Sequence, residues 1–130
     1  STREYKMAEQ AASAVLDRFG LIQVAESKAA NLPAGLQRML ELARAYIGQP
    51  RLLMLDEPSS GLNSEEIAQL KRVLNELNGE GITILLVSHD MDLVDAASHI
   101  HVLCFGEIIA SGSMAEVRQD VRVREAYLGI

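Results

Sequence analysis

Two short apolar runs constrain the fold of this chain more than any other feature. Residues 51–56 and 82–87 are both apolar over most of their length, and an amphipathic helical pattern lies between them. The apolar positions of that pattern are Ile67, Leu70, Leu74 and Leu77. Strands that are apolar on both faces are typical of parallel sheets, whose strands are joined by crossover helices. The sequence therefore predicts an α/β fold.

The remaining elements follow from periodicity and turn residues. Helices are predicted over residues 4–19, 35–47, 90–97 and 114–127. Gly20 would end the first helix, and Asn63 with Glu66 resembles a capping box that starts the crossover helix. A hairpin near residues 101–111 is predicted to turn at Gly106 and Glu107, with glycine at the first turn position. The predicted order is α-α-β-α-β-α-β-β-α.

Composition limits the classes of function. The chain has 130 residues, which suits one domain or a piece of a larger one, and its net charge is −6. No dense basic run is present, which argues against a nucleic-acid surface. The single cysteine, Cys104, excludes an internal disulfide framework and favours a reduced, intracellular setting. No apolar run is long enough to span a membrane, and we expect no signal peptide.

Polar groups follow both predicted strands at the point where each strand ends. Asp56 and Glu57 follow the first apolar run, and Ser88 and His89 follow the second. Ligands of open α/β sheets bind outside the carboxyl ends of the strands. One carboxylate can hold Mg²⁺, a second can orient or deprotonate water, and a histidine can reach a phosphate. This combination indicates nucleotide hydrolysis, in which positioning and charge stabilisation dominate catalysis.

Five stretches in this order resemble the C-terminal half of an ABC-transporter ATPase subunit. They are "LPAGLQR", "LMLDEP", "SGLN", "SHD" and "GEIIASG", and they resemble the signature sequence, the Walker B strand, the D-loop, the switch histidine and the post-switch strands. "GLN" and the ending "DVRVREAYLGI" are most similar to the ATPase subunits of branched-chain amino acid importers. The implied architecture is a partial P-loop-NTPase-type parallel sheet with crossover helices and a C-terminal β-hairpin. The implied regions are a helical and signature region (1–48), a Walker B to switch region (49–98) and a C-terminal region (99–130).

The resemblance implies a role for individual residues. Asp56 would hold Mg²⁺ through water, Glu57 would be the general base, and His89 would contact the γ-phosphate of ATP. The signature segment and the D-loop would face the nucleotide bound by a second ATPase subunit. These residues are Leu32, Pro33, Ala34, Gly35, Leu36, Gln37 and Asn63. The implied partners are transmembrane permease subunits and a second ATPase subunit, at the cytoplasmic face of the membrane.

Three departures from the family pattern are visible. None of the nine glycines is followed by lysine, so the GxxxxGK[ST] phosphate loop is absent, and the chain alone is expected to be inactive. In the signature, Pro33, Ala34 and Leu36 replace the usual serine, glycine and glutamine, and proline lacks both a hydroxyl and a backbone N–H. Asn63 stands where the D-loop often has aspartate, and Ser64 where this subfamily often has proline.

Other interpretations of these residues stay open. Two acids after a strand are often a solvated loop, and His89 lies between two good capping residues. The chain could also be a non-catalytic half-domain that docks on a permease or on another subunit. A soluble ABC ATPase of the DNA-repair type is a third possibility, although no coiled-coil insertion is present. Met39, Met54 and Cys104 are predicted core residues, and His99 and His101 are predicted to lie on a strand surface. We also expect an exposed sheet edge or apolar face.

Overall fold

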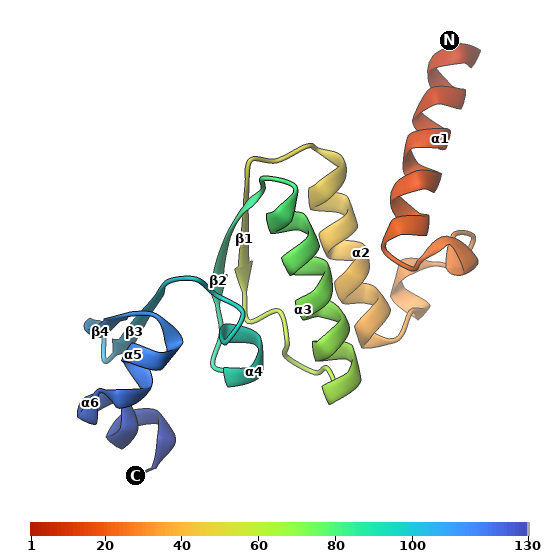
Figure 1. Ribbon diagram of the computed structural model, residues 1–130. Coiled ribbons are helices and arrows are strands. Elements are labelled where there is room, and N and C mark those ends of the chain that lie inside the picture. Colours follow the sequence, from red (N-terminus) through yellow and green to blue (C-terminus); the bar gives the residue numbers. More distant parts are fainter. Residues whose placement is uncertain (130) are drawn as a thin grey trace. The chain divides into compact units, whose positions relative to one another are not determined.

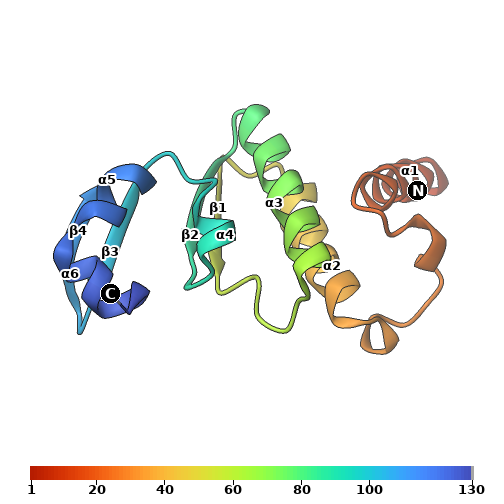
Figure 2. The same ribbon diagram turned by 60° about the horizontal axis from the view of Figure 1, so that its bottom comes forward.

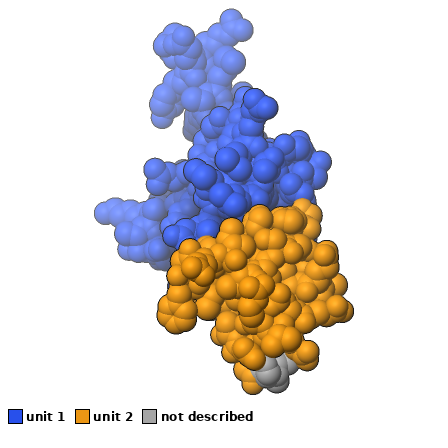
Figure 3. Space-filling view, turned by 90° about the vertical axis from the view of Figure 1, so that its left-hand side faces the viewer, with its two compact units in different colours: residues 1–87 blue, residues 88–130 orange. Residues whose placement is uncertain are grey.

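The computed structural model describes residues 1–129, and the chain divides into two compact units, residues 1–87 and residues 88–130 (Figure 3). Each unit is described by itself below. The three regions expected from the sequence, with boundaries after residues 48 and 98, remain a prediction.

The first unit is built on a parallel pair of strands. Strands β1 (Leu52–Asp56) and β2 (Thr83–Val87) pair in register from Leu52 opposite Thr83 to Asp56 opposite Val87. Helix α3 (Ser64–Gly79) is the crossover between them, and α3 and α2 (Ala34–Ile47) cover one face of the pair (Figures 1 and 2). The predicted β-α-β unit is therefore confirmed.

Helix α3 forms where its capping residues and its apolar stripe predict it. The Asn63 side chain accepts a hydrogen bond from the Glu66 N–H, and Glu66 accepts one from the Asn63 N–H, which completes the capping box. Leu70, Leu74 and Leu77 are buried on one face of the helix. Each fully buried leucine contributes about 1.5–3 kcal/mol of transfer free energy.

Helix α1 (Thr2–Arg18) is joined to α2 by two short 3₁₀ turns, at Ile22–Val24 and Ala29–Asn31. The predicted stop at Gly20 is confirmed, since its φ of +73° is a left-handed conformation that favours glycine. Phe19 is buried and packs on Tyr46 of α2, with ring centroids 5.4 Å apart. Helix α2 buries Met39, Leu42 and Ala43, so the core prediction for Met39 is correct.

The other face of the β1–β2 pair carries exposed apolar side chains. The exposed apolar side chains of the two strands are Leu52, Met54, Leu85 and Val87. Met54 is 71% exposed, so its predicted place in the core is wrong. Strand side chains alternate between the two faces, and residues 52 and 54 point away from the helix-covered face that buries Leu53.

The second unit consists of a short helix, a hairpin and a helical C-terminal segment. Its elements are α4 (Met91–Val94), β3 (Ile100–Cys104), β4 (Glu107–Gly112), α5 (Met114–Gln119), α6 (Val121–Val123) and a π-helical turn (Arg124–Leu128). Strands β3 and β4 are antiparallel, with an irregularity between Val102 and Leu103. The core is formed by Ile100, Met114 and Val117. Cys104 is half-buried, whereas His101 is exposed on β3 as predicted.

Two local predictions for this unit need correction. The hairpin turns at Phe105 and Gly106, because Cys104 pairs with Glu107 and both turn residues have positive φ (+48° and +79°). Positive φ at both central residues defines a type I′ turn, whereas the prediction was a turn with glycine at the first central position. The predicted helix over 114–127 is interrupted at Asp120, whose extended backbone ends α5 and whose side chain caps α6.

The predicted helix over 90–97 is shorter than expected. It has regular α-helical geometry only over Met91–Val94.

Within the residues that the structure describes, no helix is both long and apolar enough to cross a membrane.

Candidate functional site

The first part of the candidate site lies where β1 ends. Asp56 is the last residue of β1 and is exposed, and the partly buried Glu57 follows it. The Glu57 N–H donates a hydrogen bond to the Val87 carbonyl at 2.7 Å, one residue beyond the last paired residues of the two strands. The ends of β1 and β2 are thus held side by side, as a ligand site at the carboxyl edge of a parallel sheet requires.

Glu57 has a left-handed backbone conformation, with φ of +48°. This conformation costs a residue with a side chain about 1–2 kcal/mol relative to the right-handed region. The next residue, Pro58, is fully buried, and a following proline disfavours the right-handed helical region for Glu57. The Ser60 N–H closes the turn on the Glu57 carbonyl at 3.2 Å. Residues held in such conformations cluster at functional sites, where the surrounding structure maintains the strain.

Buried small residues connect this turn to the D-loop segment. Pro58 and Ser59 are both buried, and the Leu62 N–H donates to the Ser59 carbonyl at 3.1 Å. Asn63 is exposed and is the N-cap of α3. One short connection, partly buried, therefore carries the acidic pair at one end and Asn63 at the other.

The signature segment forms the start of α2. Pro33 is the N-cap residue and makes no side-chain capping hydrogen bond, while Ala34 begins the helix. The Gln37 amide donates to the Leu32 carbonyl at 2.9 Å and to the Ala29 carbonyl at 3.4 Å. Gln37 thus holds together the backbone that enters α2. A helix N-terminus presents free N–H groups and a positive dipole end, which suits an anion.

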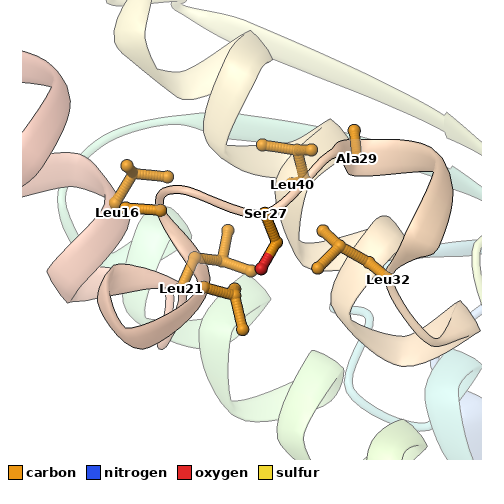
Figure 4. Close-up of a pocket in the computed structure, with 8 residues that line it drawn as sticks. Leu16, Leu21, Ser27, Ala29, Leu32 and Leu40 are labelled. Carbon is orange, nitrogen blue, oxygen red and sulfur yellow. The ribbon is translucent and has the colours of Figure 1, made fainter.

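A small apolar hollow of about 60 Å³ lies behind the signature segment, between α1, the 3₁₀ turns and α2 (Figure 4). Its lining is Leu16, Leu21, Val24, Ala25, Ser27, Ala29, Leu32 and Leu40. No charged side chain lines it, so its chemistry does not suit a nucleotide phosphate.

Ser88 and His89 belong to the second unit, directly after β2 in the chain. The Ser88 hydroxyl accepts a hydrogen bond from the Asp90 N–H at 3.0 Å, and Asp90 caps α4 through the Leu93 N–H at 3.1 Å. His89 is exposed in the turn between these two capping residues. The structure therefore brings Asp56 and Glu57 to the end of β2, and it places His89 in the turn that follows that strand.

Asp56 fits a magnesium ion by the chemistry of its donor atoms. Mg²⁺ takes one or two carboxylates, keeps several waters and completes its shell with substrate phosphates. An exposed carboxylate at the end of a strand matches that requirement. Among the described residues, no group of three or more His, Cys, Asp or Glu side chains is arranged to hold a metal.

One residue near the site was missed as a functional candidate. Glu66 was predicted only as a capping residue, yet its carboxyl group lies against Gly35 of the signature segment. A side-chain β carbon added to Gly35 would lie 2.8 Å from Glu66 Cδ and Oε1. The capping-box pattern located Glu66 on its helix, but no pattern in the sequence pointed to a contact with a residue on another helix.

Two family models match the chain. Residues 1–60 match the model described as "ABC transporter", and residues 107–130 match the model described as "Branched-chain amino acid ATP-binding cassette transporter". The crystal structure of MJ1267, described as an ATP-binding cassette of an ABC transporter, has a TM-score of 0.83 and 29% sequence identity. That match covers 91% of this chain and 49% of the other. In sequence and fold, the chain is similar to about half of an ATP-binding cassette of an ABC transporter.

The sequence relatives specify the subfamily that the chain resembles. The high-affinity branched-chain amino acid transport ATP-binding protein LivG of Salmonella typhimurium is 46% identical over 116 residues, covering 88% of this chain and 46% of LivG. The corresponding protein BraF of Pseudomonas aeruginosa is 40% identical over 129 residues, covering 98% of this chain and 51% of BraF. The chain thus spans about half the length of these relatives, and it is similar over most of its own length to branched-chain amino acid transport ATP-binding proteins.

Proposed function

We propose that this chain forms part of an ATP-hydrolysing subunit that drives the import of branched-chain amino acids through a transmembrane permease. The observation that carries the proposal is the pair Asp56 and Glu57 at the carboxyl end of β1, joined to the end of β2 by the Glu57–Val87 hydrogen bond. The names of LivG and BraF support the substrate class.

Each polar group of the site has a proposed role. Asp56 would hold Mg²⁺ through water, and the bound cation would neutralise charge on the phosphates. Glu57 would accept the proton of the water that attacks the γ-phosphate, because a carboxylate within hydrogen-bond reach of that water can act as its base. His89 would donate a hydrogen bond to a γ-phosphate oxygen. ATP and Mg²⁺ are the ligands of the proposed site.

The site would be shared between two ATPase subunits. Asp56, Glu57 and His89 would act on the nucleotide bound by their own subunit, while the signature segment and Asn63 would face the nucleotide of the second subunit. The free N–H groups at the start of α2 support this, because they suit a phosphate. Pro33 supplies neither a hydroxyl nor an N–H there, so the contact made by this subunit would be weakened. The subunit would bind peripherally to the permease at the cytoplasmic face of the membrane.

The 130-residue chain by itself would not hydrolyse ATP. It contains no GxxxxGK[ST] sequence, and a loop of that type makes most of the contacts with the β- and γ-phosphates in P-loop enzymes. The second candidate function, a non-catalytic docking module, is favoured by the same observation and by Pro33.

The full-length subunit, reconstituted with its permease in liposomes, tests the proposal. Glu57→Gln is expected to lower steady-state ATP hydrolysis about a hundredfold or more, because it removes the base without changing the size of the side chain. Glu65→Gln, the same change at an exposed position in the first turn of α3, is the matched control and should leave the rate unchanged. The rate should also rise with a branched-chain amino acid and not with lysine.

A loss of less than about tenfold in Glu57→Gln would contradict the proposed base. If, instead, the unmodified subunit bound to the permease but showed no measurable hydrolysis, the docking function would replace the enzymatic one.

A further inference from the structure

The carboxyl group of Glu66 contacts two segments that the proposed function assigns to the nucleotide of the second subunit. Its Oε2 accepts a hydrogen bond from the Asn63 N–H at 3.0 Å. Its Cδ and Oε1 lie on the other side against Gly35, where an added β carbon would approach both to 2.8 Å. Both Glu66 and Gly35 are partly buried.

The glycine at position 35 is explained by space and not by backbone conformation. Gly35 is the second residue of α2 and is not among the residues with positive φ, so its backbone is one that alanine would also adopt. Contacts under 3.0 Å are essentially never made by real β carbons, so any side chain at this position would displace Glu66. The hydrogen bond to Asn63 resists that displacement, because it fixes the far end of the Glu66 side chain.

The position of this carboxyl group is also electrostatically favourable. Glu66 is the third residue of α3, and Gly35 lies in the first turn of α2. Helices α2 and α3 lie side by side with their N-terminal ends at the same end of the unit (Figures 1 and 2). A negative charge near a helix N-terminus is favourable, and this carboxylate lies close to the first turns of both helices. Pro33 provides no side-chain cap for α2, so Glu66 is the acidic group that the structure places there.

We propose that Glu66 is a positioning residue of the shared nucleotide site, which fixes the signature segment at Gly35 and the D-loop at Asn63 as one rigid body. This inference rests on the proposed function, since it concerns the same site. Because the Glu66 side chain contacts both the signature segment and the D-loop, it sets the distance between them. A nucleotide bound by the second subunit would then meet both segments in one arrangement. In this arrangement the carboxyl group of Glu66 occupies the space that a side chain at position 35 would take.

A double-mutant cycle on the full-length subunit in the assembled transporter tests the contact. Gly35→Ala should lower kcat for ATP hydrolysis about tenfold, and Glu66→Ala should lower it by a similar factor. The double variant should be no slower than Glu66→Ala, because alanine at 35 then has room. Gly79→Ala is the control: Gly79 is also helical, an added β carbon meets nothing within 4 Å, and kcat should not change.

The conservative variant and the kinetic constants separate positioning from general stability. Glu66→Gln retains both the capping box and the shape of the side chain, so it should recover most of the kcat that Glu66→Ala loses. The KM for ATP should stay within about twofold in all variants, because the proposed effect is on the assembled site. Losses that multiply in the double variant, or a Gly35→Ala variant with normal kcat, would overturn the proposal.

The melting temperatures of the same set of variants test the contact between Glu66 and Gly35 without relying on ATP hydrolysis, so the inference can be judged separately from the proposed function. Gly35→Ala should lower the melting temperature of the purified subunit when Glu66 is present and should have no such effect in the Glu66→Ala background. If hydrolysis is insensitive to Glu57→Gln, the proposed function and the positioning role fail together, while the melting cycle still decides the contact. If hydrolysis depends on Glu57 but neither cycle shows coupling, the positioning role alone is overturned.

Discussion

Glu57 combines a chemically useful side chain with a backbone conformation that disfavours any side chain. Its φ of +48° is maintained by its hydrogen bond to Val87 and by the buried Pro58 that follows it. A residue that only ended a strand would more often be glycine here, because glycine adopts positive φ at no steric cost.

This strain predicts an unusual order of stability for two variants. The free energy of unfolding of the Glu57→Gly variant should be about 1 kcal/mol higher than that of Glu57→Ala. Both substitutions remove the carboxylate, but only glycine adopts the left-handed conformation without steric strain. Urea denaturation of the full-length subunit measures the difference. In the control, Ala68→Gly at an exposed site inside α3 should lose about 0.5–1 kcal/mol. Equal stabilities of the glycine and alanine variants at 57 would show that the backbone there is not strained.

At the scale of elements, the start of α3 depends on a reciprocal pair of hydrogen bonds. The Asn63 side chain accepts from the Glu66 N–H at 2.9 Å, and the Glu66 carboxylate accepts from the Asn63 N–H at 3.0 Å. Both donors would otherwise be unsatisfied at the first turn of the helix. The cap therefore fixes the end of the D-loop as well as the beginning of the helix.

Removal of the cap should destabilise the chain by a predictable amount. Asn63→Ala is expected to lower the free energy of unfolding by about 1 kcal/mol, within the usual range of about 0.5–2 kcal/mol for such caps. The matched control is Asn75→Ala, at an exposed position inside α3, where alanine is the better helix former and stability should not fall. Chemical denaturation monitored by circular dichroism compares the two variants. A loss of the same size in both would argue against a capping role.

Helix α5 also begins with a capping box, formed by Ser113 and Glu116, and it is sensitive to acid. The N–H of Ser113 donates to the Glu116 carboxylate, and this hydrogen bond, with a smaller contribution from the Ser113 side chain, holds the pKa of Glu116 below its ordinary value of 4.5. Because the folded-state pKa is depressed, the contribution of this cap is present above pH 4.5. It is lost as the pH falls through the folded-state pKa.

An NMR titration of the Glu116 carboxyl carbon checks this. The midpoint should lie below 4.5 in the unmodified protein and should rise toward that value in Ser113→Ala, which removes the hydroxyl. A midpoint unaffected by that substitution would show that the Ser113 side chain does not contribute.

At the scale of the whole molecule, the face of the β1–β2 pair opposite α2 and α3 exposes several apolar side chains. Met54 and Leu85 are 71% and 55% exposed on adjacent parallel strands, and Leu52 and Val87 lie on the same two strands. Contiguous exposed apolar side chains on a sheet favour association with another surface. The covered face, by contrast, is protected by α2 and α3 (Figure 2).

The printed chain is therefore expected to self-associate when it is expressed alone. Replacing both Met54 and Leu85 by threonine, which suits strands, should shift sedimentation at high concentration toward the monomer. The matched control replaces Tyr5 and Met7, which are 72% and 59% exposed on helix α1 and do not form a contiguous sheet surface, by threonine, and it should leave association unchanged. An unmodified chain that sediments as a monomer at all concentrations would contradict the expectation.

Elements with local signals were predicted well, and contacts between distant residues were not. The strands, the long helices, the stop at Gly20 and the cap at Asn63 follow from periodicity and from interactions that span at most four residues. The hairpin turn was misplaced by one residue, because the pairing of Cys104 with Glu107 depends on the register of two strands. The core position of Met54 was wrong, because hydrophobicity alone does not specify which face of a sheet is covered.

The sequence by itself determined the β-α-β unit, the acidic pair at the end of a strand and the resemblance to ABC-transporter ATPase subunits, since each is a matter of local order along the chain. Only the tertiary structure decided that Glu57 has a left-handed backbone held by the Val87 carbonyl. It also decided that Glu66 fills the space beside Gly35. The physical reason is that both features depend on packing between segments about 30 residues apart, where steric exclusion and hydrogen-bond geometry act without any periodic trace in the sequence.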